Sequence, residues 1–77
     1  MKLNIKYFGL IAEITNCNEE TIEFSNATIG DLKKVLLDKY HELNTKDFQI
    51  AQNKEIVSNN TKVSGKEIAL LPPFSGG

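Results

Sequence analysis

The start of the chain alternates between polar and apolar side chains. Residues 2–8 read Lys-Leu-Asn-Ile-Lys-Tyr-Phe, and a period of two predicts a strand with one buried face. Three residues of this strand are expected to face a core: Leu3, Ile5 and Tyr7. Lys6 and Phe8 then face the other way. Residues 10–14 fit a helical turn, and residues 21–24 predict a second strand that completes an N-terminal hairpin.

One amphipathic helix is predicted over residues 29–42. Apolar residues recur there at helical spacing, namely Ile29, Leu32, Val35, Leu36, Tyr40 and Leu43. The opposite face carries Lys33, Lys34, Asp38 and Lys39. Thr28 is a good N-cap because its hydroxyl can accept a hydrogen bond from a free amide of the first turn. Asp31, three residues on, suits the positive end of the helix dipole.

Short strands are predicted in the second half of the chain, over residues 48–52, 55–57 and 67–71, with turns at 53–54, 59–60 and 64–66. In the last strand Ile68 and Leu70 would point inward, which leaves Ala69 and Leu71 on the opposite face. A single helix can cover one face of a mixed sheet and close a core. The first and last strands, separated by the helical crossover, could then lie side by side and parallel.

That order of elements predicts an α+β fold of the ubiquitin-like, or β-grasp, type, with a mixed sheet of about four or five strands on one main helix. A chain of 77 residues forms one domain, here residues 1–77. So small a body can hardly hold a deep catalytic cavity. This favours a carrier or binding module over a free-standing enzyme.

Charge and composition exclude several classes of protein. The chain has nine lysines, no arginine and ten carboxylates, which are interspersed and give a net charge of −1. We therefore expect no nucleic-acid partner, since such proteins usually carry a clustered basic face. No apolar run is long enough for a membrane span or a signal peptide, so we expect a cytoplasmic protein. One cysteine, Cys17, and one histidine, His41, are too few for a structural zinc site, and Cys17 is read as an incidental thiol.

The end of the chain has an unusual composition. The last predicted strand runs into Pro72-Pro73-Phe74-Ser75-Gly76-Gly77. Proline cannot continue a sheet, and Pro72-Pro73 favours a stiff polyproline conformation. At roughly 3 Å per residue, residues 72–77 could project about 15–20 Å beyond the fold. A frayed end is the alternative, but two terminal glycines occur by chance in only about 0.5% of chains. The pattern therefore favours a terminus that enters a narrow slot in another protein.

The ending Ile68-Ala69-Leu70-Leu71-Pro72-Pro73-Phe74-Ser75-Gly76-Gly77 resembles that of the small, sulfur-carrier subunit of molybdopterin synthase. The opening at residues 5–9 and the turn at residues 63–67 are similar too, and the likeness covers essentially the whole chain. Pro-Pro followed by a terminal Gly-Gly is the discriminating motif. A bare Gly-Gly is shared by the thiamine-pathway sulfur carrier and by ubiquitin-like modifiers. Phe74 departs from the smaller aliphatic residue expected there, which could change how the tail seats.

The resemblance implies that Gly77 is the site of chemistry and that Gly76 provides access. An E1-like adenylyltransferase would use ATP to make an acyl-adenylate on Gly77, and a persulfide sulfur donor would convert it to a thiocarboxylate. The large synthase subunit would take this sulfur for cyclic pyranopterin monophosphate, in a heterotetramer of two small and two large subunits. The catalytic side chains then belong to the partner. The chain itself binds no permanent cofactor and no metal.

A docking surface is expected on the sheet face away from the helix. Phe8 and Leu71 are expected on that face, and Ile56 could lie there too. If the first and last strands are neighbours, Phe8 and Leu71 form an exposed apolar patch at the root of the tail, and such patches commonly mark partner sites. The tail residues Pro72, Pro73, Phe74 and Ser75 are expected to contact the partner as well. Scattered surface hydrophobes are the alternative interpretation.

Three other functions stay open. The chain could carry sulfur for thiamine thiazole or for tRNA thiolation, although the Pro-Pro pair argues against it. It could be a protein modifier joined to lysines through Gly77, or a plain interaction module that is indifferent to its last residue.

Overall fold

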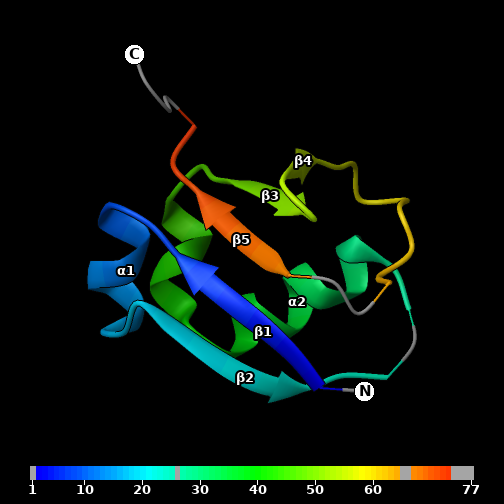
Figure 1. Ribbon diagram of the computed structural model, residues 1–77. Helices are drawn as coiled ribbons and strands as arrows, with labels where there is room; N and C mark the ends of the chain where they lie inside the picture. Colours follow the sequence, from blue (N-terminus) through cyan, green and yellow to red (C-terminus); the bar gives the residue numbers. More distant parts are fainter. Residues whose placement is uncertain (1, 26, 65–66, 74–77) are drawn as a thin grey trace.

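The computed structural model describes residues 2–25, 27–64 and 67–73. In chain order its elements are β1 (Lys2–Tyr7), α1 (Leu10–Thr15), β2 (Glu19–Glu23), α2 (Ile29–Lys39), the 3₁₀ helix η1 (His41–Thr45), β3 (Gln49–Gln52), β4 (Glu55–Ile56) and β5 (Ile68–Leu71). Figure 1 shows the strands as one layer, with α2 packed behind it. The predicted strand order, with one main helix between the hairpin and the later strands, is confirmed.

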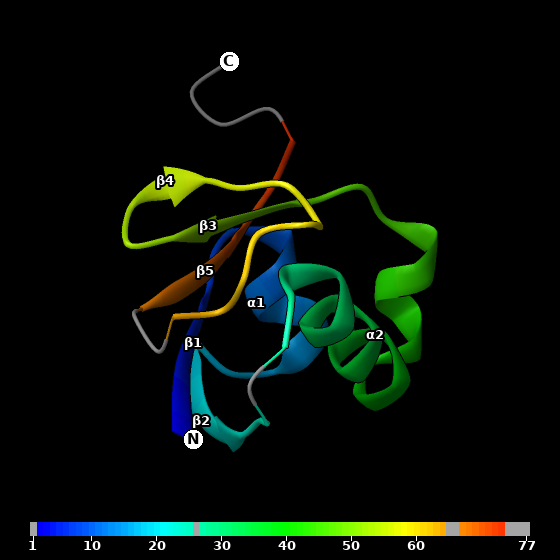
Figure 2. The same cartoon turned by 90° about the vertical axis from the view of Figure 1, so that its right-hand side faces the viewer.

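The described strands form a single mixed sheet in the order β2-β1-β5-β3-β4. The first and last strands are parallel neighbours, with Ile5 opposite Ile68 and Tyr7 opposite Leu70. The other pairings are antiparallel. Figure 2 shows α2 on one side of this sheet. This topology is the predicted ubiquitin-like β-grasp.

The core lies between the sheet and α2. The largest fully buried side chains are Leu3, Ile5, Ile29, Leu32, Leu36, Leu43, Ile68 and Leu70. They come from β1, β5, α2 and η1, so the predicted inward faces of both central strands are confirmed. Fully burying one such side chain stabilises the fold by about 1.5–3 kcal/mol. The central strand pair and α2 therefore form the rigid base from which the surface residues project.

The start of α2 follows the predicted capping pattern. The Thr28 hydroxyl accepts a hydrogen bond from the Asp31 backbone amide at 3.3 Å, and Asp31 Oδ2 accepts one from the Thr28 amide at 3.2 Å. This reciprocal pair is a capping box. The hydrogen bonds from the Thr28 backbone and hydroxyl lower the pKa of the Asp31 carboxyl.

Two details of the predicted helix are wrong. The α-helix ends at Lys39 rather than at residue 42, because Tyr40 adopts φ −125° and ψ 86° and leaves the helical region. The chain continues as η1, which still buries Leu43. Val35 was assigned to the apolar stripe but is 42% exposed. It lies about 100° around the helix from Leu36, at the edge of the stripe.

Strand bounds differ from the predicted ones by one or two residues. β2 begins at Glu19 rather than at residue 21, and β3 begins at Gln49, one residue after Phe48. Pairing with β1 extends β2, since Glu19 lies opposite Lys6 and Glu20 opposite Ile5. The predicted turn at residues 64–66 lies partly outside the described residues.

A carboxylate network joins the hairpin to the helix and was not predicted. Glu20 accepts hydrogen bonds from the Tyr7 hydroxyl at 2.5 Å, the Tyr40 hydroxyl at 2.5 Å and Lys39 Nζ at 2.7 Å. The two tyrosine rings meet edge to face, with centroids 6.0 Å apart. Burial alone would raise the pKa of the Glu20 carboxyl, but the hydrogen bonds from Lys39, Tyr40 and Tyr7 outweigh it and lower the pKa. Burial, followed by the bond to Glu20, raises the pKa of each tyrosine.

Candidate docking face and tail root

The sheet face away from α2 carries the side chains that alternate along each strand with those facing α2, and of the residues named on this face only Ala51 is buried. Across the strands, one row consists of Lys6, Ala69, Ala51 and Ile56, which are successive register partners on β1, β5, β3 and β4. The next row toward the C-terminal end of β5 contains Leu71 and its partner Gln49. Phe8 follows β1 beside Leu71, because its amide donates to the Leu70 carbonyl at 3.2 Å.

This face is apolar near the end of β5 and partly open to solvent. Phe8 is 45% exposed and Ile56 is 55% exposed, while Leu71 and Ala69 are half-buried. Neighbouring strands lie about 4.8 Å apart, so β1 and β4 are about 14 Å apart across the sheet. We name the set Phe8, Ile56, Ala69 and Leu71 the outer patch. The sheet thus presents Phe8, Ile56 and Leu71 on one face, as expected from the sequence.

An ion pair between Lys6 and Glu67 borders the outer patch at the end where β5 begins. Lys6 Nζ lies 2.8 Å from Glu67 Oε2, and both side chains are more than a third exposed. The hydrogen bond to Glu67 raises the pKa of Lys6, and the same bond lowers the pKa of Glu67. An exposed pair of this kind contributes little to stability. Its main effect is to give the patch a polar rim.

The root of the tail is fixed against the loop after β1. β5 ends at Leu71, as the prolines predicted. Gly9 has φ 58°, and a Cβ at this position would lie 3.0 Å from Cγ of Pro72. A left-handed backbone and this close approach both favour glycine. Pro72 is half-buried there and Pro73 is exposed.

Two hollows flank the tail root. One, of about 350 Å³, lies beside the outer patch and is lined by Lys6, Tyr7, Phe8, Gly9, Ala12, Asn18 and Glu19. The other, of about 230 Å³, lies on the α1 side and is lined by Leu10, Ile11, Ile14, Thr45, Lys46, Asp47, Pro72 and Pro73. Pro72 and Pro73 therefore stand at the rim of a recess. A partner that binds the outer patch would therefore also meet the hollow beside Phe8.

Four of the predicted site residues, Phe74, Ser75, Gly76 and Gly77, lie outside the described residues. Within residues 2–25, 27–64 and 67–73, no group of three or more histidine, cysteine or acidic side chains could hold a metal ion. None of the helices in these same ranges is long and apolar enough to span a membrane. Cys17 is half-buried, and its thiol lies 3.8 Å from the Thr15 hydroxyl.

The strand order and the helix that covers one face of the sheet define a ubiquitin-like β-grasp protein. Residues 5–77 match the ThiS family, and the chain belongs to that family. It is 31% identical over its full length to the molybdopterin synthase sulfur carrier subunit of Chlamydomonas reinhardtii, covering 100% of both chains. It is 29% identical to the subunit of the same name from Caenorhabditis briggsae, covering 100% of this chain and 99% of that one. The resemblance drawn from the sequence is thereby confirmed.

Solved structures show the same fold. The crystal structure of SAMP1 from Haloferax volcanii aligns with a TM-score of 0.81 at 24% identity and covers all of both chains. A Pyrococcus furiosus structure, named as a candidate molybdopterin converting factor subunit 1, aligns with a TM-score of 0.86 at 24% identity. It covers 95% of this chain and 98% of that chain. At these identities the likeness bears on the fold alone.

Proposed function

We propose that this chain carries sulfur on the carboxylate of Gly77 and donates it as the small subunit of molybdopterin synthase. The observation that carries the proposal is the full-length likeness to sulfur carrier subunits of that enzyme. The ending Pro72-Pro73 with a terminal Gly76-Gly77, which lies within that likeness, is the part of the chain that would carry the chemistry. The acceptor is cyclic pyranopterin monophosphate. The chain supplies sulfur, and the catalytic side chains belong to the large subunit.

The chemistry follows from the weakness of a carboxylate as an electrophile. An E1-like adenylyltransferase uses ATP so that the Gly77 carboxylate attacks the α-phosphorus, which releases pyrophosphate and forms an acyl-adenylate. The outer sulfur of a persulfide donor then attacks the acyl carbon and displaces AMP, a good leaving group, which gives an acyl disulfide. A thiol next attacks the donor's sulfur, and the S–S bond breaks to leave the thiocarboxylate on Gly77 and a disulfide on the donor. Gly76 has no side chain and leaves the terminus access to a narrow slot. No permanently bound cofactor is needed on this chain.

The described tail root suits such a carrier. β5 is a central strand, bonded to β1 on one side and to β3 on the other. Pro72 packs on Gly9 at the point where the strand ends. The peptide after Pro73 therefore departs from a fixed point on a rigid body. Pre-organisation of this kind lowers the entropy that a partner must overcome to seat the terminus.

We propose that the outer patch docks the large subunit, with Pro72, Pro73, Phe74 and Ser75 continuing the contact. Its apolar centre and polar rim resemble the usual make-up of a protein interface. The resemblance further suggests a heterotetramer of two small and two large subunits in the cytoplasm.

Phe8→Asp tests the docking role. A charge at the β1 end of the patch should weaken binding to the large subunit by about 2 kcal/mol, or roughly thirtyfold. Val35→Asp is the matched control, because it places the same charge at an apolar site of similar exposure on α2, away from the sheet face. Calorimetric titration measures both. Equal affinities for the two variants would refute docking through Phe8.

Sulfur transfer itself is tested with purified synthase subunits and the pterin precursor. The loaded chain should convert the precursor to a dithiolene, and deletion of Gly77 should abolish product while leaving the melting temperature unchanged. Product formed equally well by the deletion variant would exclude chemistry at Gly77. Transfer to a thiazole precursor or to tRNA instead would assign the chain to another sulfur pathway.

A protein-modifier role is the second candidate, because SAMP1, a small archaeal modifier protein, shares the fold. It predicts isopeptide-linked adducts of this chain on cellular proteins. The carrier role predicts few such adducts, and immunoblots of cells that express the tagged chain distinguish the two.

A further inference from the structure

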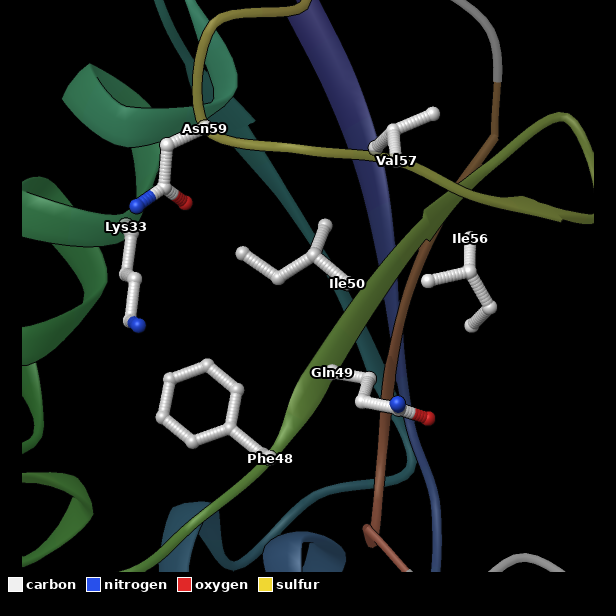
Figure 3. Close-up of a pocket in the computed structure, with 7 residues that line it drawn as sticks. All are labelled: Lys33, Phe48, Gln49, Ile50, Ile56, Val57 and Asn59. Carbon is white, nitrogen blue, oxygen red and sulfur yellow. The ribbon is translucent and has the colours of Figure 1, made fainter.

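A groove opens at the far edge of the sheet, away from the tail root. It has a volume of about 240 Å³ and is lined by Lys33, Phe48, Gln49, Ile50, Ile56, Val57 and Asn59. Figure 3 shows Lys33, Phe48, Ile50 and Asn59 around one hollow between α2 and β3. Ligand sites for small molecules usually measure about 300–1,000 Å³. The groove is smaller and suits one or two side chains of another protein.

The groove sets a few half-buried apolar side chains beside a cation. Ile50 is buried, and Phe48 and Val57 are half-buried. Lys33 Nζ lies 5.3 Å from the centroid of the Phe48 ring. Within the part of the chain that the structure describes, Lys33 forms no salt bridge, whereas Lys6 and Lys39 each have a glutamate. Lys33 is thus a half-buried cation that contacts a ring and can still accept a carboxylate partner.

The walls of the groove are held by backbone hydrogen bonds. The Val57 amide donates to the Ile50 carbonyl at 3.1 Å, and the Gly30 amide donates to the Asn59 carbonyl at 2.9 Å. The first bond fixes the β4 side, and the second fixes the Asn59 loop to the start of α2. The hollow therefore exists before any ligand binds, which reduces the entropy lost on binding.

The groove adjoins the outer patch around the edge strand β4. Ile56 belongs to both, and in Figure 3 Gln49 and Ile56 lie on the opposite side of the β3 ribbon from Phe48 and Ile50. A protein that covers Ile56 needs to pass only the two-residue edge strand β4 to reach Lys33.

We propose that this groove is a second contact site for the protein that docks on the outer patch, and that it receives a carboxylate side chain with an apolar neighbour. Lys33 pairs with the carboxylate, the Asn59 side-chain amide offers a further donor, and the apolar neighbour packs on Phe48 and Val57. This inference rests on the proposed docking function. It goes further by naming the chemistry of the partner's segment. It also places a determinant of specificity outside the sheet face that carries the outer patch.

Two adjacent lysines allow a matched test. Lys33→Glu reverses the charge inside the groove, whereas Lys34→Glu makes the same change at an exposed position that does not line it. We expect Lys33→Glu to weaken binding to the large subunit at least tenfold and Lys34→Glu to change it less than about twofold. Thermal melts should show both variants folded. Equal effects of the two substitutions would overturn the proposal.

Three outcomes of these binding measurements distinguish a failure of the groove proposal from a failure of the proposed function. Absence of binding by the wild-type chain contradicts the proposed function as a whole. Binding that falls in Phe8→Asp but is unchanged in Lys33→Glu contradicts only the groove. Self-association of the wild-type chain, lost in Lys33→Glu and kept in Lys34→Glu, would assign the groove to a second copy and overturn the proposal.

Discussion

Replacing Glu20 by alanine should destabilise the fold far more than replacing a neighbouring glutamate. Glu20 accepts hydrogen bonds from Tyr7, Tyr40 and Lys39 and so links β1 and β2 to the end of α2. In Glu20→Ala the Tyr7 hydroxyl, on a side chain only 2% exposed, has no partner from this network. Leaving a buried donor unpaired costs about 1–3 kcal/mol.

The other two partners contribute less. Tyr40 is half-buried and can regain a hydrogen bond from water, which suggests a loss of about 1 kcal/mol. The Lys39 side chain is 47% exposed, so its ion pair is worth under about 1 kcal/mol. The expected total is about 3 kcal/mol. The whole domain has roughly 4–12 kcal/mol of stability, so the variant still folds at room temperature.

Urea denaturation and thermal melting measure this loss. For a domain of this size about 3 kcal/mol corresponds to a fall in Tm of roughly 12–24 °C. Glu19→Ala is the control, because Glu19 lies on the same strand but is exposed, and it should cost under about 0.5 kcal/mol. In a Tyr7→Phe background, Glu20→Ala should cost about 1–2 kcal/mol less, since the phenol is absent. A loss indistinguishable from that of Glu19→Ala would refute the network's role.

Three further predictions concern stability. Because the folded-state pKa of Glu20 lies below its unfolded value, the network's contribution is complete above the unfolded pKa and is lost as the pH falls through the folded pKa. The urea midpoints of the wild type and Glu20→Gln should therefore converge as the pH is lowered below the unfolded pKa, and a constant gap would contradict the sign of the shift. Thr28→Ala removes half of the capping box and should cost about 1 kcal/mol by urea denaturation, with Ser retaining most of the stability; a neutral alanine would argue against the cap. Gly9→Ala places a Cβ 3.0 Å from Cγ of Pro72 in a left-handed backbone and should lower the free energy of unfolding by about 2 kcal/mol. Pro72→Ala should restore part of this loss, and no recovery in the double variant would leave backbone strain alone as the cause.

The sequence predicted the features that depend on strong periodicity. Alternation in β1 and β5 identified Leu3, Ile5, Ile68 and Leu70 as core residues, and all four are fully buried. The capping box was readable because Thr28 and Asp31 lie three residues apart, as such a box requires. The end of β5 followed from proline chemistry.

Features that depend on contacts distant in sequence were missed. The Glu20 network joins residues 13 and 20 positions apart, and nothing in the local pattern shows that Tyr7 and Tyr40 meet the same carboxylate. One signal was available, since a tyrosine on a buried strand face usually needs a partner for its hydroxyl. Lys33 was assigned only to the polar face of the helix, because the other residues that line its groove come from β3, β4 and the segments beside them, which are distant in sequence. Val35 was misplaced because a helical stripe has no sharp edge in sequence.

The central claim is that the Gly77 carboxylate exchanges an oxygen atom for sulfur. Intact-mass spectrometry of the chain, after incubation with its activating enzyme, ATP, a persulfide donor and a thiol, tests it most directly. We predict an increase equal to the mass difference between one sulfur and one oxygen atom, localised by fragmentation to Gly77 and absent when ATP is omitted. An unchanged mass under loading conditions, or sulfur found on Cys17 instead, would contradict the account.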